Sequence, residues 1–426
     1  MAGASVSDVY SFGAAKELYS DDREYQLNIA NTLYKYINKD SSRISLDGNY
    51  FNIDCAFQLN ESYAAINDNE ALPIAGVPKD VFAKYRSKNH YATIEMTTKA
   101  ATRGHSGGLV DGKYQDRLVK GTLLTFISNI NFDLYGNGRG KRAVIESATA
   151  TQSSFVVDSA ARIRPGMIFD WYDSTLATLR GSIQISAKGV DRMTRTVYID
   201  SSYGTGEVPS GAAADDVLVV KGSLDAGEPS DGRHLAGMER ITDNTVSLGE
   251  INPSTYAEWQ AVNQNLSGGS ITQQALQIQF DSMHDIAGYY PDRCAFNTAQ
   301  KRSYLAQFLN QRRFSTNSFD TGASSLTFDP LKMGVDEKNK KPGDIIMIED
   351  KDCDPDVWYF WCNEHLILAE DYFGQPHMAD EDGSDFRFRQ GFDSLQGFYR
   401  FWTNTVVDKR NCIGKIYNLA IPSGVL

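Results

Sequence analysis

Two different hydrophobic periods follow each other in the first hundred residues. Over residues 21–40, apolar side chains recur at spacings of three and four, which predicts an amphipathic helix. This stripe consists of Leu27, Ala30, Leu33, Tyr34 and Ile37. Residues 49–66 and 81–98 are instead rich in aromatic and β-branched residues, which favours extended strands. Asn, Asp, Gly and two prolines fill residues 67–80, so the sequence predicts a long hairpin with a polar tip.

The predicted hairpin has too few apolar residues on its two faces to form a core by itself. An isolated two-stranded hairpin is at best marginally stable in water. We therefore expect another part of the assembly to cover it, and a second subunit fits this role best.

The helical period returns after the glycine-rich stretch that ends at Gly108. The apolar stripe of this long helix consists of Tyr114, Leu118, Leu123, Leu124, Ile127, Ile130 and Leu134. The sequence GNGRGK then ends it. Its alternating glycines are similar to a nucleotide-binding loop, but they follow a helix instead of a strand, and Arg142 replaces the Ser or Thr that would hold magnesium. We interpret the segment as a glycine stop, with basic residues beside the negative end of the helix.

Residues 143–222 change to short strands separated by turn residues, which predicts a small β-barrel or sandwich module. A Gly-rich connector occupies residues 222–238, and the remainder mixes helices and strands. In this remainder, residues 254–266 are predicted as a helix and the aromatic run within 356–370 as core strand. A chain of 426 residues can bury a large core and is expected to hold two or three domains. The pattern as a whole predicts an α+β protein.

The net charge argues against one class of function, and the charge is unevenly distributed along the chain. The net charge of −12 argues against a dedicated nucleic-acid-binding protein. Residues 101–142 nevertheless carry seven Lys/Arg against three Asp/Glu, a net of +4, whereas residues 336–400 carry seven against sixteen, a net of −9. One mildly basic and one acidic surface would follow; ordinary solvated faces are the alternative.

The cysteines and the hydropathy indicate the cellular compartment in which the protein is made. The five cysteines are an odd number and widely spaced, which is typical of reduced thiols in a protein made in cytoplasm. Apolar runs of the length that spans a bilayer are absent, and the N-terminal residues show no secretion signal. We expect no membrane association.

The pentapeptide GHSGG at 104–108 matches the G-x-S-x-G signature of serine hydrolases and makes Ser106 a candidate nucleophile. That signature needs a buried strand directly before the serine and a helix directly after it. The preceding stretch alternates like a half-exposed strand, and several residues delay the helix. A glycine-rich hinge at Gly104, Gly107 and Gly108 is therefore the favoured interpretation.

Two acidic loops and one Cys–His pair are candidate metal sites. The run DKDCDPD at 350–356 spaces its aspartates like a calcium loop, but Pro355 and Trp361 stand where an EF-hand needs glycine and glutamate. The loop 379–385 could hold calcium, and a solvated acidic loop is the alternative. Cys362 and His365 have zinc-like spacing without a second pair. We assign no catalytic, cofactor-binding or metal-binding residue.

The order of the predicted elements resembles the major capsid protein of tailed double-stranded DNA bacteriophages, which has the HK97-like fold. That order is N-terminal arm and helix, long hairpin, glycine hinge, long helix, and then mixed α/β ending in a strand. The phrases ESYAAINDNEALPIAG, YATIEMTTKAATRG and FDLYGNGRG are similar to phrases of related capsid chains and fall within about residues 55–142.

The resemblance implies six segments. They are an N-terminal arm and helix at 1–48, an extended E-loop at 49–102, the spine helix of a P-domain at 103–142, an inserted β-rich, barrel-like module at 143–222, mostly A-domain at 223–400, and C-terminal return strands of the P-domain at 401–426. It also implies a shell-forming structural protein without enzymatic activity or cofactor, located in the virion capsid and made in the bacterial host cytoplasm.

The same resemblance implies site residues and partners. Candidate intersubunit residues at the E-loop tip are Asp68, Glu70, Pro73, Lys79 and Asp80. The hinge at Gly104, Gly107 and Gly108 would let the E-loop swing. Candidate basic residues facing DNA are Arg117, Lys120, Arg139, Lys141 and Arg142. Expected partners are further copies in hexamers and pentamers, a scaffolding protein, a portal, a decoration protein, and packaged DNA through nonspecific contacts.

Two other functions stay open at this point. One is a serine hydrolase that uses Ser106. The other is a phage decoration or tail-tube protein, although such proteins usually lack the long helix.

Overall fold

The computed structural model describes residues 31–68, 70–99, 113–224, 232–307, 345–370, 376–378 and 386–422, and side chains of the helix at 113–135 from residue 118 onwards. The chain divides into two compact units. Unit 1 consists of Met1–Lys35, Ser87–Asn131 and Glu370–Thr403; unit 2 consists of Tyr36–Arg86, Phe132–Ala369 and Asn404–Leu426. The hinge glycines and Ser106 lie outside the described residues.

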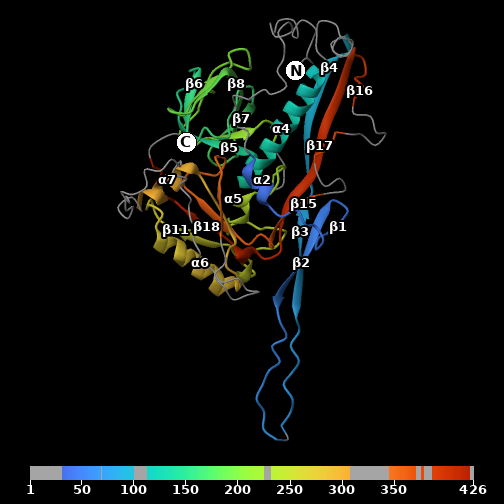
Figure 1. The fold of residues 1–426 in the computed structure, drawn as a ribbon, viewed down its shortest axis with the longest axis vertical. Coiled ribbons are helices and arrows are strands. Elements are labelled where there is room, and N and C mark those ends of the chain that lie inside the picture. Colours follow the sequence, from blue (N-terminus) through green and yellow to red (C-terminus); the bar gives the residue numbers. More distant parts are fainter. Residues whose placement is uncertain are drawn as a thin grey trace, which may run out of the picture. The chain divides into compact units, whose positions relative to one another are not determined.

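Unit 1 is built on a long antiparallel strand pair. Strand β4 (Lys88–Thr97) pairs with β17 (Ser394–Val407) in one register from Thr97 opposite Ser394 to Lys88 opposite Thr403 (Figure 1). The short strand β16 (Arg387–Phe388) pairs with β17 as well, and the sheet order is β15-β17-β16 with β15 at Leu366–Glu370.

Helix α4 (Lys113–Tyr135) packs on this strand pair through its apolar stripe. The rings of Phe126 and Tyr399 stack at 6.4 Å, and the hydroxyl of Tyr399 donates to the carbonyl of Val119 at 3.5 Å. The preceding helix α2 (Thr32–Tyr36) meets α4 where the amide of Tyr34 donates to the side chain of Asn131 at 3.0 Å. The long helix that the sequence predicts is therefore present, and a strand of high sequence separation covers it.

Unit 2 begins with a three-stranded sheet of β1 (Ser45–Asp47), β2 (Tyr50–Gln58) and β3 (Lys79–Arg86). Alternate side chains of β2 and β3 are buried, as period-two patterning requires. These side chains are Phe51, Ile53, Cys55, Ala83 and Tyr85. The hydroxyl of Tyr85 donates to the carbonyl of Val407 at 2.9 Å and fixes the sheet to the end of β17 within the unit.

The stretch with many short predicted strands forms a closed six-stranded barrel in the order β10-β5-β6-β9-β8-β7. Its strands are β5 (Lys141–Ser147), β6 (Ser154–Val157), β7 (Ile168–Tyr172), β8 (Leu179–Asp191), β9 (Thr196–Ile199) and β10 (Val217–Val220). Phe155 and Trp171 meet edge to face at 4.9 Å in its buried interior. Closure leaves no strand edge unpaired around the barrel.

A five-stranded mixed sheet holds the second core of unit 2, in the order β11-β18-β14-β12-β13. Its strands are β11 (Val262–Asn265), β12 (Arg293–Phe296), β13 (Ile346–Glu349), β14 (Trp358–Trp361) and β18 (Ile413–Tyr417). The helical segments of this part are α5 (Met238–Ile241), η2 (Ala257–Trp259), α6 (Gln273–Ala287), α7 (Thr298–Gln307) and η4 (Arg410–Cys412). Central β14 is buried at all four positions, as its continuous aromatic sequence predicts.

Three local predictions are wrong. The extended stretch predicted at 49–66 ends as a strand at Gln58, so the loop of the hairpin covers residues 59–78. The stretch predicted as one strand at 81–98 divides at Ser87 into β3, which pairs with β2, and β4, which pairs with β17. Residues 254–266, which look helical, form η2 and the parallel strand β11. Periodicity gives the type of backbone but does not name the partner that a strand pairs with.

Within the described part of the chain, no helix is both long enough and apolar enough to cross a bilayer.

Candidate assembly surface

The hairpin of unit 2 ends in a long loop, residues 59–78, which we call the arm loop. In Figure 1 it extends well beyond the ends of β2 and β3. Its large apolar side chains point into solvent, with Tyr63 exposed to 94 % and Ile74 to 93 %. The full set is Leu59, Tyr63, Ile66, Leu72, Ile74 and Val77. Such a concentration of exposed apolar surface is typical of a segment that another protein surface covers.

Hydrogen bonds within the arm loop give it a defined shape. The amide of Gly76 donates to the side-chain oxygen of Asn60 at 2.9 Å and links the two sides of the loop. At the tip, the amide and the side-chain nitrogen of Asn67 both donate to the carboxylate of Glu70 at 3.0 Å. The hydrogen bond from the Asn67 amide, joined by the one from its side chain, holds the pKa of Glu70 below its ordinary value.

The base of the arm loop is fixed by aromatic contacts within unit 2. The ring of Phe57, at the end of β2, stacks on Tyr256 at 4.4 Å. The ammonium group of Lys79 lies 5.0 Å from the centre of the same Tyr256 ring, and Trp259 meets Phe57 edge to face at 5.8 Å. The arm loop therefore leaves a rigid base.

The structure divides the five predicted tip residues into two groups. Asp68, Glu70 and Pro73 lie in the arm loop and are exposed. Lys79 and Asp80 are the first residues of β3, so their assignment to the tip is corrected: Asp80 pairs with Ala56, and Lys79 contacts Tyr256 at the base. The apolar residues on both sides of the tip are not among the predicted site residues, because residues 59–66 have the composition of a strand.

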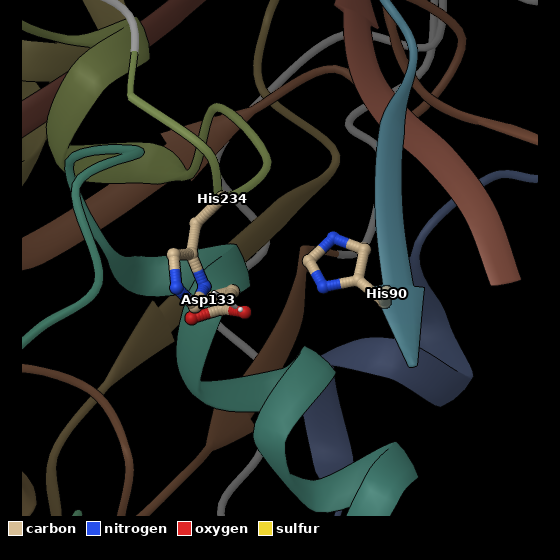
Figure 2. A group of neighbouring side chains, drawn as sticks. All are labelled: His90, Asp133 and His234. Carbon is tan, nitrogen blue, oxygen red and sulfur yellow. Dashed lines mark hydrogen bonds and ion pairs between the residues drawn. The ribbon is translucent and has the colours of Figure 1, made fainter. Parts of the chain in front are cut away.

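A second polar arrangement lies where α4 ends. Asp133 accepts from the guanidinium of Arg142 at 2.7 Å, and its other oxygen lies 2.8 Å from Nδ1 of His234. Nε2 of His234 in turn lies 2.7 Å from the hydroxyl of Ser223. Figure 2 shows the ring of His234 directed at the Asp133 carboxylate. The order serine, histidine, aspartate is that of a catalytic triad.

Gly140 decides against catalysis at this arrangement. A Cβ atom at Gly140 would lie 2.6 Å from the Ser223 hydroxyl and 2.8 Å from Nε2 of His234, so the backbone of Gly140 already occupies the space that a substrate carbonyl needs. Ser223 is also buried. The arrangement instead ties the glycine turn after α4 to the end of the barrel. Gly140 has φ +74°, and only glycine combines that backbone with so close an approach.

The predicted DNA-facing residues lie in different environments. Lys120 is exposed on α4, and Arg139 is half-buried. The prediction for Arg142 is wrong, because this side chain is 1 % exposed and paired with Asp133. Lys141 is also engaged within the protein: its ammonium lies 3.1 Å from Glu239, whose charge raises the pKa of Lys141. The side chain of Arg117 lies outside the described residues.

The acidic run at 350–356 serves as an internal anchor. Asp350 and Asp352 are buried, and the hydroxyl of Tyr135 donates to Asp350 at 3.2 Å. Arg162 donates to the carbonyl of Asp352 at 2.8 Å and pairs with Asp354 at 2.9 Å. These contacts join the loop after β13 to the barrel and to the end of α4.

Comparisons with known proteins support the fold. No protein-family model and no curated protein matches this chain. A chain of the Cyanophage A-1(L) capsid asymmetric unit superposes with a TM-score of 0.53 at 9 % identity, over 95 % of this chain and 97 % of that chain. The capsid of the native GTA particle gives 0.45 at 8 % identity over 94 % of both chains, and Gordonia phage Cozz gives 0.42 at 11 % identity over 99 % and 98 %.

At such identities the likeness shows the fold, and we rest that conclusion on the cyanophage chain. The HK97-like α+β fold, which the order of elements in the sequence predicts, is confirmed. The position of Ser106 is not described, and the fold gives the hydrolase alternative no support.

Proposed function

We propose that this chain is a major capsid protein, which assembles through copies of itself into the icosahedral or prolate head shell that encloses a phage genome. The observation that carries the proposal is the arm loop. It presents apolar side chains to solvent on a rigid base, in a chain whose fold is that of a phage capsid subunit. A fold alone does not define a function, but this surface requires a cover, and self-association supplies one.

In the proposed shell, the arm loop of each subunit lies on a neighbour. The same contact then repeats around each hexamer and pentamer, and a repeated heterologous contact closes into rings when the rotation fits. Each subunit would gain contacts twice, once as donor of an arm loop and once as its recipient. Full burial of one Ile or Leu side chain contributes about 1.5–3 kcal/mol, so several such residues suffice for a stable contact.

The finer assignments belong to the same proposal. Residues 49–102 serve as the E-loop, 103–142 as the spine-helix segment, 143–222 as an inserted module, and most of 223–400 as the A-domain, with 1–48 as the N-terminal arm and 401–426 as the return of the P-domain. Gly104, Gly107 and Gly108 form the hinge. A scaffolding protein, a portal and a decoration protein are the expected partners. Lys120 and Arg139 are the described basic residues that remain candidates for nonspecific contacts with packaged DNA. The protein is made in the bacterial cytoplasm and ends in the virion.

The test measures assembly and folding separately. The full chain, alone and with its scaffolding protein, is examined by sedimentation velocity and electron microscopy, and we expect shells or rings. In a variant that replaces residues 61–76 by a short glycine-containing turn, we expect an unchanged circular dichroism spectrum and melting temperature of the monomer. Particle yield should fall strongly, because every subunit loses contacts as donor and recipient.

A matched control shortens the β8–β9 turn at 192–195, which contains the exposed Met193 and Thr194 and lies on the barrel and not on the arm loop. This variant should assemble normally. A chain that stays monomeric under all conditions, or that forms normal shells without its arm loop, would contradict the proposed function.

A further inference from the structure

Two of the five cysteines face each other at one end of the five-stranded sheet. Strand β14 ends at Trp361 and β18 begins at Ile413, and these two residues are paired in the antiparallel register. Cys362 and Cys412 occupy the next positions, where the amide of Cys362 donates to the carbonyl of Cys412 at 3.2 Å. Both are free thiols, and both belong to one small buried cluster with Ala287.

The distance between the two positions suits a covalent link. Directly opposed residues of an antiparallel pair have Cα atoms about 4.5–5.5 Å apart. A disulfide needs Cα atoms about 4.4–6.8 Å apart, so the backbone requires little movement. The thiol of Cys362 donates to the backbone carbonyl of Tyr290 at 3.3 Å, within the same buried cluster as Cys412. The thiol of Cys353 contacts the backbone carbonyls of Ala295 and Val357 at 3.9 Å.

The surroundings make Cys412 the more acidic of the two thiols. The neighbouring Cys362 thiol lowers the pKa of Cys412 against the effects of burial and of Asp408, and the nearby positive charges of His365 and Lys409 lower it further. His365 is held by Asp408, with 2.9 Å between Nδ1 and the carboxylate, and Lys409 is held by the carbonyl of Ala287 at 2.7 Å. A thiolate is the nucleophile in thiol–disulfide exchange.

We propose that Cys362 and Cys412 form a dithiol that is oxidised to an intramolecular disulfide by a small-molecule disulfide such as oxidised glutathione. The thiolate of Cys412 attacks one sulfur of the small disulfide and releases a thiolate, which leaves a mixed disulfide. Cys362 gives up its proton to the released thiolate and attacks the Cys412 sulfur, and the second small thiol leaves. Two protein thiols and one small disulfide become one protein disulfide and two small thiols.

The short turn between Cys362 and His365 lies at the surface, where the side chain of Glu364 is exposed. Local opening of such a turn is less costly than unfolding of the sheet. The link would close a loop that contains β15, β16 and β17 and would fix the start of β18 to the end of β14. The moment at which the disulfide forms rests on the proposed function, because a virion leaves the reducing cytoplasm at lysis. The chemistry of its formation is independent of that function.

The test starts with the full chain under native conditions, in glutathione buffers of increasing oxidised fraction that contain a metal chelator. After alkylation and digestion, mass spectrometry should find a peptide pair joined through Cys362 and Cys412, which is reversed by dithiothreitol. The oxidised protein should melt about 5 °C or more above the reduced protein.

The controls separate this pair from the other thiols. Cys412→Ala should show neither the linked peptide nor the shift in Tm, whereas Cys294→Ala, which removes an equally buried thiol from β12, should retain both. Absence of the linked peptide in the fully oxidising buffer, or only a glutathione adduct on one cysteine, would overturn the proposal, as would a lower Tm of the oxidised protein. The linked peptide is measured in the unassembled chain too, so failure to form shells would count against the proposed function and not against the dithiol.

Discussion

Gly140→Ala tests whether the turn after α4 depends on the close contact between its backbone and the Ser223–His234 pair. A suitable control is Gly166→Ala, because Gly166 also has a positive φ, +81° against +74° for Gly140. A Cβ at Gly166 meets nothing within 4 Å, whereas a Cβ at Gly140 would lie 2.6 Å from the hydroxyl of Ser223. Gly166→Ala is therefore destabilised by backbone strain alone, whereas Gly140→Ala is destabilised by the same strain and by the overlap with Ser223.

The expected magnitudes follow from these contacts. An alanine at a positive φ costs about 1–2 kcal/mol at either position. At Gly140 the overlap forces Ser223 to rotate away, which breaks its 2.7 Å hydrogen bond with His234 and leaves buried polar atoms without it. Overpacking costs about 1–3 kcal/mol, and a lost buried hydrogen bond about 1–3 kcal/mol. We expect Gly140→Ala to destabilise the protein by about 2–4 kcal/mol more than Gly166→Ala.

The assay is urea denaturation followed by tryptophan fluorescence, in which Trp171 reports on the barrel interior. Both variants and the wild type are compared under the same conditions, so that the difference between the two variants removes the shared backbone strain. Equal losses of stability in the two variants, within about 0.5 kcal/mol, would refute the account of Gly140, because the overlap would then have been relieved at no cost.

Three further predictions concern the arm loop and pH. Ile74→Ser should leave the Tm of the monomer unchanged but weaken the contact between subunits by about 1.5–3 kcal/mol per subunit. Sedimentation should therefore show that assembly needs a protein concentration at least about tenfold higher. The control Met193→Ser changes an exposed residue of the barrel and should alter neither the Tm nor this concentration. Glu70 should titrate below its ordinary pKa near 4.5, so the tip is intact above that pH and loosens as pH falls through the lowered pKa; an ordinary NMR titration of Glu70 would contradict this. Against the opposing effect of burial, Asp408 raises the pKa of His365 above 6.5, so protonated His365 stabilises the fold below that pH and the contribution disappears as pH rises through the raised pKa. In His365→Asn, the urea midpoint should vary less with pH between pH 6 and pH 9 than in the wild type. The same pH dependence in both proteins would exclude this role.

Much of the fold could be predicted because local patterns determine it. The stripe on the long helix, the alternation in β2 and the continuous aromatic run of β14 are properties of neighbouring residues, and the structure has these elements at those places. The order of these elements also resembles the HK97-like fold, and the likeness to the cyanophage capsid chain supports that fold. Patterns failed where pairing decides the outcome: residues 254–266 look helical, yet β11 forms there because β18 pairs with it.

The candidate surface could be predicted only in part. The sequence alone predicts a long hairpin at this place, and β2 and β3 form its base in the structure. The tertiary structure decided which residues carry the surface. Lys79 is drawn to the base because the ring of Tyr256, far away in the sequence, attracts its charge, and Arg142 is buried because Asp133 and the barrel enclose it. Cys362 and Cys412 are fifty positions apart in the sequence and become neighbours only through the register of β14 and β18. Composition and periodicity reflect the preference of each residue for a secondary structure and for burial, whereas contacts between distant residues exist only after the chain has folded.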